Sequence, residues 1–96
     1  MRVDFTVNNY VTSPGQDLYV VGNVPELGNW DVTKAVKLNW MDSDTWSGPV
    51  FFTASKGSAI QYKYIMRQET TWENGSNRSY TVPSSGSGSR NENWQY

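Results

Sequence analysis

The feature that most constrains this chain is an alternation of apolar and polar residues in short runs that turn-forming residues interrupt. Residues 2–8 (RVDFTVN) alternate Val3, Phe5 and Val7 with polar residues, as a half-buried strand does. Residues 59–67 (AIQYKYIMR) alternate in the same way. One predicted face of that strand carries Ile60, Tyr62, Tyr64 and Met66, and the other carries Gln61, Lys63, Ile65 and Arg67.

Five further segments have strand character: 17–22, 35–40, 45–54, 78–82 and 91–96. In the segment 35–40, Val36, Leu38 and Trp40 share one predicted face. The Gly/Ser-rich run 83–89 is predicted to be a loop rather than a linker, because alternation resumes after it. The polar segment 23–31 is also expected to be a loop, and no stretch has the 3.6-residue period of a helix. Seven or so short strands predict an antiparallel β-sandwich or open barrel.

Composition excludes several classes of function. The 96 residues are expected to form one domain over residues 1–96, and 15% aromatic content predicts that some rings lie on the surface. The net charge is −1 with scattered Lys and Arg, which argues against nucleic-acid binding. The sequence has neither a long apolar run nor a leader, so neither a membrane span nor a signal peptide is expected. Cys and His are absent, which removes the commonest ligands of transition metals and the commonest general base.

The carboxylates are the remaining candidates for catalysis. Asp42 with Asp44, and Glu26 with Asp31, could be interpreted as the acid pair of a glycoside hydrolase. Acids in turns, however, are usually turn formers whose side chains bond to nearby backbone. The sequence therefore predicts a protein that is not an enzyme and has neither a metal nor a cofactor.

Two tryptophans lie in polar turns. Trp72, in TTWENGSNRSY, and Trp30, in LGNWD, could each cap the end of the sandwich or be presented to a ligand. A sugar suits such rings, because its C–H face packs on an aromatic face while amides and charged groups bind its hydroxyls. Lys63 points away from Tyr62 and Tyr64, and is either a solvated strand lysine or such a polar partner.

The chain resembles a known family through VDFTVNN, GQDLYVVGNVPELGNWD, IQYKYI, TWENGSNRSYTVP and ENW. It is similar, over nearly its whole length, to family 20 carbohydrate-binding modules. These are the starch-binding domains of amylases, glucoamylases and cyclodextrin glycosyltransferases. The resemblance implies an all-β fold, an immunoglobulin-like antiparallel β-sandwich (an open-sided barrel) of about seven to eight short strands. It also implies a module excised from a starch-active enzyme, secreted with its parent and monomeric.

The resemblance implies non-catalytic binding of starch and other α-1,4-glucans, such as maltooligosaccharides and cyclodextrins, which would target an attached catalytic domain to its substrate. The alternative is an immunoglobulin-like spacer that binds no sugar. The first implied carbohydrate site consists of Trp30, Lys63, Trp72, Glu73 and Asn77. A second, less well matched site would use Thr12, Ser13, Gly15 and Asp17, with Trp40 or Tyr10 as its aromatic residue. Trp46 and Trp94 are expected to pack in the core.

Overall fold

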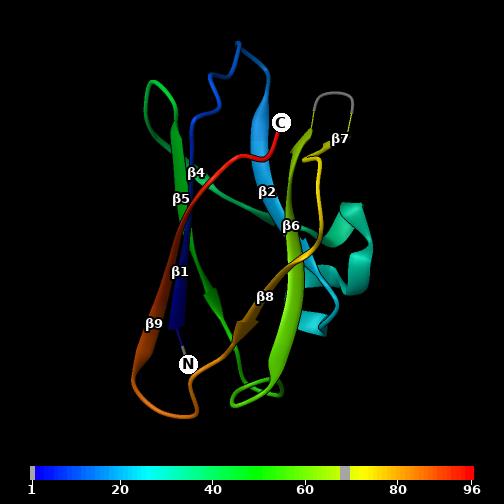
Figure 1. Cartoon of the computed structure of the whole chain (residues 1–96), viewed down its shortest axis with the longest axis vertical. Helices are drawn as coiled ribbons and strands as arrows, with labels where there is room; N and C mark the ends of the chain where they lie inside the picture. Colours follow the sequence, from blue (N-terminus) through cyan, green and yellow to red (C-terminus); the bar gives the residue numbers. More distant parts are fainter. Residues whose placement is uncertain (1, 68–69) are drawn as a thin grey trace.

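Two β-sheets form the fold, which the computed structural model describes for residues 2–67 and 70–96; Met1, Gln68 and Glu69 lie outside the described residues. The first sheet has the order β4-β5-β1-β9 and the second β3-β2-β6-β7, with β8 also pairing with β6 (Figure 1). The strands are β1 (Arg2–Asn8), β2 (Asp17–Gly22), β3 (Val36–Lys37), β4 (Asn39–Asp42), β5 (Thr45–Phe51), β6 (Ala59–Arg67), β7 (Thr71–Trp72), β8 (Arg78–Thr81) and β9 (Ser87–Asn93). This two-sheet arrangement confirms the predicted all-β sandwich.

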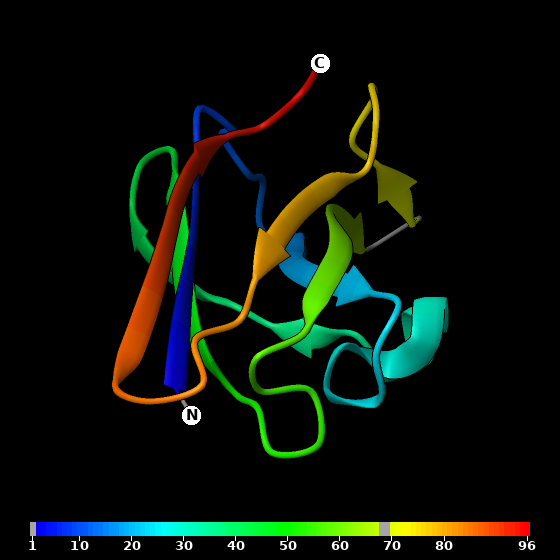
Figure 2. The same cartoon turned by 60° about the horizontal axis from the view of Figure 1, so that its bottom comes forward.

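The core lies between the two sheets, which Figure 2 shows as separate layers. Alternate residues of each strand enter it, because successive side chains of a strand point to opposite faces. The Phe5 ring from the first sheet meets Tyr62 from the second edge-on, with centroids 5.1 Å apart. The predicted inner face of residues 59–67 is confirmed, since Ile60, Tyr62, Tyr64 and Met66 are all buried. Trp46 and Trp94 are also buried, as expected.

The last strand differs from its prediction. β9 covers Ser87–Asn93, so the predicted boundaries, a loop over 83–89 and a strand over 91–96, are wrong. β9 pairs with β1 in parallel, whereas the other described pairs are antiparallel. Gly88 lies within the strand because the Tyr80 hydroxyl packs over it; a Cβ there would lie 2.2 Å from Tyr80 Oη. Part of the Gly/Ser run is thus strand that leaves room for a neighbouring ring.

The predicted strand 35–40 is also wrong as one element. It divides into β3, in the second sheet, and β4, in the first. Leu38 lies at the crossing, where its side chain is buried and its N–H donates to Leu18 O at 2.9 Å. Trp40 does not share the buried face with Leu38, because its side chain is 59% exposed. Two other predicted strands end early, at Phe51 and Thr81, and β7 was not predicted.

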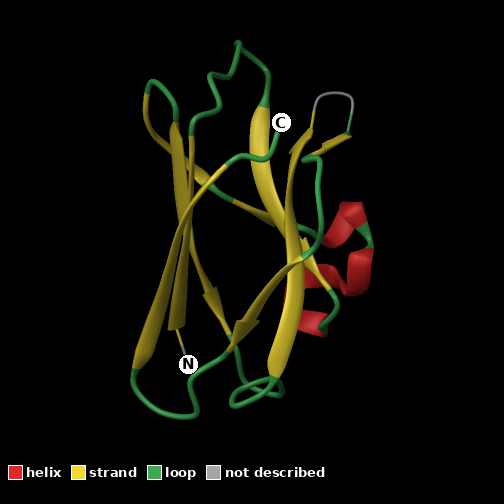
Figure 3. Ribbon diagram, in the orientation of Figure 1, coloured by secondary structure: helices red, strands yellow, loops and turns green. Residues whose placement is uncertain are grey.

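A short 3-10 helix, η1 (Pro25–Trp30), replaces part of the predicted loop 23–31, and a second, η2 (Val32–Lys34), follows it. They lie on the outer side of the sheet that contains β2 and β6 (Figure 3). Arg67 from β6 holds η2 there, since its Nη1 donates to Val32 O at 3.0 Å. Within residues 2–67 and 70–96, no helix has the length and apolar character needed to cross a membrane.

Candidate functional site

Trp30 and Trp72, which are 42 positions apart in the sequence, lie side by side on the outer side of the second sheet. Their ring centroids are 6.1 Å apart and the ring planes are tilted by 43°. Trp72 is 39% exposed and Trp30 is partly exposed. The structure therefore joins the two tryptophans of polar turns into one angled aromatic surface.

The backbone before Trp30 turns through an unusual run of left-handed residues. Gly28, Asn29 and Trp30 have φ values of +83°, +50° and +63°. Only glycine adopts this region without strain, and Gly28 has a second constraint, because a Cβ there would lie 2.8 Å from Lys34 O. Such outliers are often found at functional sites. The run ends η1 and places the Trp30 ring beside Trp72.

Asp31 directly follows Trp30 and is the N-cap residue of η2. Its Oδ1 accepts hydrogen bonds from the Thr33 hydroxyl at 2.6 Å and from Thr33 N at 3.0 Å. These bonds lower the pKa of Asp31, because they favour the charged carboxylate. Asp31 thus caps a helix that fixes the chain after Trp30.

Trp72 is positioned by its pairing with β6. It lies opposite Ile65, and partners in an antiparallel pair point to the same face. Ile65 is fully buried although it belongs to the outer face predicted for residues 59–67. The outer face of the second sheet is therefore partly covered, which gives the Trp72 ring an apolar surface beneath it.

Two polar residues predicted for the site lie near the same turn. Lys63 Nζ donates to Glu73 O at 3.1 Å and to Gly75 O at 2.7 Å. Asn77 is exposed, and its Nδ2 donates to Gln61 Oε1 over 3.4 Å. Gln61, which was not among the predicted site residues, shares the outer face of β6 with Lys63, as the strand alternation had indicated. These side chains form a polar margin beside the turn that follows Trp72.

Glu73 does not belong to that margin. Its side chain is fully buried and its carboxylate accepts four hydrogen bonds. Oε1 accepts from Tyr64 N and Arg78 Nε, both at 3.0 Å, and Oε2 accepts from Arg78 Nη2 at 3.0 Å and Gln95 N at 3.1 Å. With these donors in place, the Glu73 carboxylate faces the interior, opposite to the side on which Trp72 lies. The expected contact between Glu73 and a ligand hydroxyl has no geometric support.

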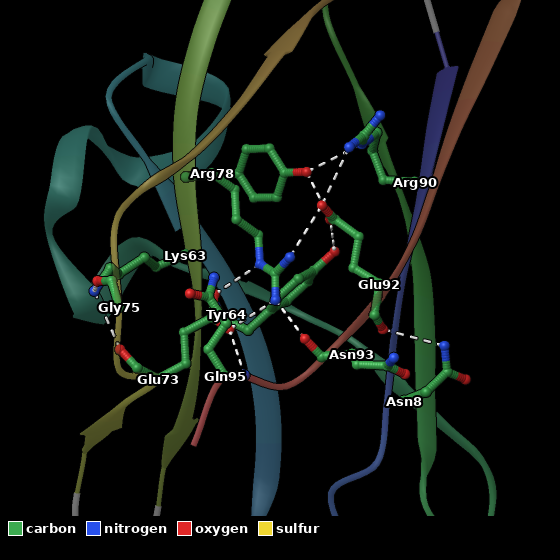
Figure 4. A network of polar contacts seen from close by, with 11 residues as sticks. Asn8, Lys63, Tyr64, Glu73, Gly75, Arg78, Arg90, Glu92, Asn93 and Gln95 are labelled. Carbon is green, nitrogen blue, oxygen red and sulfur yellow. Dashed lines mark hydrogen bonds and ion pairs between the residues drawn. The ribbon is translucent and has the colours of Figure 1, made fainter.

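Glu73 forms part of a buried polar network that sequence reasoning missed (Figure 4). Glu92, from β9, is its second carboxylate. Glu92 Oε1 accepts from the hydroxyls of Tyr62, at 2.6 Å, and Tyr64, at 3.0 Å, and Oε2 accepts from Arg78 Nη1 at 3.1 Å and Arg90 Nη2 at 3.2 Å. The only sequence signal was the presence of Arg78 and Glu92 in the segments N-R-S-Y and E-N-W, which gave no indication of pairing.

The network has clear effects on protonation. Burial raises the pKa values of Tyr62 and Tyr64, and the nearby Glu92 charge raises them further. Burial opposes the charge of Arg78, but its bonds to Glu73 and the charges of Glu73 and Glu92 outweigh this and raise its pKa. The tyrosines therefore stay neutral donors while the guanidinium stays charged.

The carboxylates considered for catalysis have structural roles. Glu26 accepts from Thr53 N, Ser55 N and the Ser55 hydroxyl at 2.8–3.1 Å, so it holds the loop after β5. Asp42 Oδ1 accepts from Asp44 N at 3.4 Å, as expected of an acid that forms a turn. Neither pair has the two free carboxyl groups that glycoside hydrolysis requires.

The residues predicted for a second site occupy two neighbourhoods. The loop with Thr12, Ser13 and Gly15 is closed by hydrogen bonds between Ser13 and Gln16, and Gly15 has φ +89°. Asp17 lies 3.8 Å from Lys37 Nζ. The two candidate aromatics have different neighbours. The Tyr10 ring packs on Trp94 at 4.5 Å and stacks on Tyr96 at 6.3 Å, whereas Trp40 lies exposed on β4 opposite Trp46.

Comparison with known proteins places the chain in a family. A family model described as "Starch binding domain" matches residues 1–92. The cyclomaltodextrin glucanotransferase of Thermoanaerobacterium thermosulfurigenes is 46% identical over 97% of this chain, and the chain spans 14% of that relative's length. The glucoamylase of Hypocrea jecorina is 33% identical with a TM-score of 0.85, over 99% of this chain and 17% of that one.

One solved structure corresponds to the module alone. It is the family 20 carbohydrate-binding module of the maltotetraose-forming amylase from Pseudomonas saccharophila STB07, which is 31% identical with a TM-score of 0.79. That likeness covers 94% of this chain and 100% of the other. The curated relatives are much longer, because the chain spans 14 to 17% of their length. This chain belongs to the starch-binding domain family, whose members are non-catalytic carbohydrate-binding modules.

Proposed function

We propose that this chain binds α-1,4-glucans on the paired rings of Trp30 and Trp72. The observation that supports this most strongly is the ring geometry, 6.1 Å between centroids and a 43° tilt. A helical α-glucan curves, so rings set at an angle can each stack on one of two adjacent glucose units. Each stacked ring contributes about 0.5–1.5 kcal/mol beyond its buried area, so the affinity of a single module is modest.

Lys63 and Asn77 bind glucose hydroxyls in this proposal, and Gln61 joins them. The Lys63 ammonium has three protons and makes two hydrogen bonds to carbonyl oxygens, so one proton remains for a hydroxyl. The Asn77–Gln61 contact is long, at 3.4 Å, and exchanges readily for a bond to sugar. Glu73 contributes through its position in the fold and does not contact the ligand.

The whole protein's role follows from tethering. A secreted starch-active enzyme that carries this module has its catalytic domain held near starch, which raises the effective substrate concentration. The module acts as a monomer on a polysaccharide ligand, with neither nucleic acid nor membrane as a partner. The alternative, a spacer that binds no sugar, predicts that the chain remains in solution when it is mixed with granular starch.

Calorimetric titration of β-cyclodextrin into the chain tests the proposal. Trp30→Ala and Trp72→Ala are each expected to weaken binding about tenfold, and the double variant is expected to abolish it. Asp4→Asn, on β1 of the first sheet, is a control away from the paired rings and from the residues predicted for a second site. Unchanged affinity in a folded Trp30→Ala/Trp72→Ala protein contradicts the proposal.

The same titration addresses the second site. A stoichiometry of two that falls to one in Trp40→Ala assigns a second site to the exposed ring of β4. A fall caused instead by Tyr10→Ala assigns it to the loop after β1. A stoichiometry of one in the wild-type protein leaves the Trp30–Trp72 surface as the whole binding site.

A further inference from the structure

The turn after Trp72 is closed at its base by an ion pair. Glu73 follows β7 and Arg78 begins β8. The Nε and Nη2 atoms of Arg78 each donate to one Glu73 carboxylate oxygen at 3.0 Å, and these two parallel bonds form the Arg78 fork. This two-bond geometry requires the planar guanidinium, because an ammonium group cannot bond two oxygens in the same fixed plane. The pair therefore fixes the distance between the two ends of the turn.

The residues just outside this ion pair belong to the proposed binding surface. Trp72 precedes Glu73, and Asn77 precedes Arg78; both have exposed side chains, whereas Glu73 is buried and Arg78 largely so. Neighbouring residues in extended backbone point to opposite sides. The inward Glu73–Arg78 pair consequently sets the spacing of the outward Trp72 and Asn77.

The pair is anchored to the opposite sheet. Arg78 also donates to Glu92 Oε2 at 3.1 Å and to the Asn93 carbonyl, both from β9, and its guanidinium lies 5.3 Å from the Tyr64 ring centre (Figure 4). Gln95 N donates to Glu73 and Gln95 O accepts from Asn74 N at 2.8 Å. The base of the turn is thus held by the segment 92–95, which the first sheet carries.

The turn itself also lies against this segment. Gly75 has φ +86°, and a Cβ there would lie 2.1 Å from Gln95 Oε1. On the other side of the turn, Lys63 Nζ bonds the carbonyls of Glu73 and Gly75. The turn therefore has contacts on its inner side and on its outer side, which leaves its backbone little freedom.

We propose that Arg78 is a positioning residue for glucan binding. Its two hydrogen bonds to Glu73 hold Trp72 and Asn77 in place before the sugar binds. This inference rests on the proposed function. Preorganisation removes the entropy cost of ordering these side chains on binding, so loss of the fork weakens binding without removing any contact to the sugar.

The test is Arg78→Lys, which keeps the charge but not the fork. Its dissociation constant for β-cyclodextrin is expected to rise about tenfold. Arg90→Lys is the matched control: Arg90 also bonds Glu92, at 3.2 Å, but its other contacts are with Tyr62 and Tyr80 rather than with the turn. Arg90→Lys is expected to bind β-cyclodextrin as the wild type does. Both variants are compared at temperatures well below unfolding, which chemical denaturation establishes for each.

Circular dichroism of the tryptophan pair gives a readout that does not depend on sugar. Two indoles 6.1 Å apart couple electronically, and the coupled signal changes when their relative orientation changes. Arg78→Lys is expected to reduce this signal and Arg90→Lys to leave it intact. Should the wild type fail to bind β-cyclodextrin, the proposed function fails while this spectrum still decides the role of Arg78.

Three results would overturn the inference. Arg78→Lys could bind with wild-type affinity, it could keep the wild-type tryptophan spectrum, or Arg90→Lys could weaken binding equally, which would indicate a general loss of stability. If Arg78→Lys does not fold, Glu73→Gln tests the same fork from its other side, since an amide offers Arg78 one acceptor in place of two. The same results are then expected of Glu73→Gln.

Discussion

At the scale of single residues, neighbours in the chain have opposite surroundings on the two sides of one turn. Trp72 and Asn77 are exposed, while Glu73 and Arg78 pair in the interior. A glutamate in a run of Asn, Gly and Ser is expected to be exposed, because such runs usually form surface turns. It is buried because four donors from three separate segments converge on it. Polar character in the sequence therefore does not indicate exposure where partners come from distant positions.

The first prediction concerns Glu92, whose carboxylate is 10% exposed and bonds two tyrosines and two arginines. Glu92→Gln is expected to lower the free energy of unfolding by about 2 kcal/mol, because it removes the negative charge that accepts hydrogen bonds from Arg78 and Arg90, while Arg78 keeps Glu73 as its second partner. Urea denaturation followed by circular dichroism measures the loss.

Asp4→Asn is the matched control for Glu92→Gln. Asp4 also pairs with an arginine, Arg2, but both side chains of that pair are about half exposed. The expected change in unfolding free energy is within about 0.5 kcal/mol, because water screens the pair. If both variants lose the same free energy of unfolding, burial does not increase the contribution of the Glu92 network to stability.

At the scale of elements, the η1–η2 segment shows how an irregular piece of backbone presents a ring. Trp30 reaches Trp72 because three successive left-handed residues end η1 and Asp31 then caps η2. A regular helix or strand through these positions would direct the ring elsewhere. The segment was predicted to be a loop because Gly and Pro interrupt it, but nothing in its composition indicates the direction of Trp30.

The second prediction concerns Gly28. Gly28→Ala is expected to destabilise the fold by about 2 kcal/mol or more, because a left-handed φ of +83° is combined with a 2.8 Å approach to Lys34 O. It is also expected to weaken β-cyclodextrin binding, since the backbone that positions Trp30 must move. Denaturation and calorimetry check the two effects.

Gly86→Ala separates the cost of backbone strain from the cost of a steric clash with the added Cβ. Gly86 also has a left-handed φ, +77°, but no atom lies within 4 Å of the position of its Cβ. Its expected cost is about 1 kcal/mol, from backbone strain alone, with β-cyclodextrin affinity unchanged. A larger loss of stability in Gly86→Ala than in Gly28→Ala would contradict the steric argument.

At the scale of the whole molecule, buried hydrogen bonds tie the two sheets together. Tyr62 and Tyr64, from the second sheet, donate to Glu92 of the first through a core that is otherwise mainly apolar. These tyrosines have pKa values above the ordinary 10.0, because burial disfavours the phenolate and Glu92 repels it. The sandwich therefore depends on their neutral form.

The third prediction is a loss of stability in alkali. A tyrosine whose pKa is raised by folding contributes stability that is complete below its unfolded value, 10.0, and is lost as the pH rises from there towards the folded value. The free energy of unfolding is expected to fall above about pH 10. Tyr62→Phe should show a smaller fall, and a fall as steep as that of the wild type would contradict the assignment. Urea titrations at a series of pH values provide the measurement.

The sequence alone determined the class of fold. Alternation marked the strands 2–8 and 59–67, because a strand with one buried face must repeat every second residue, and β-branched and aromatic residues marked the strand 17–22. It also determined the family resemblance and singled out Trp30, Trp72, Lys63 and Asn77. These inferences rest on local patterns, which a single chain segment carries by itself.

Only the tertiary structure decided the rest. The division of 35–40 between two sheets, the parallel pairing of Ser87–Asn93 with β1, and the burial of Glu73 all depend on partners far away in the sequence. The placement of Trp30 against Trp72 depends on such contacts too. The physical reason is that the side to which a residue points follows from its own backbone, whereas the atoms it meets there come from other elements.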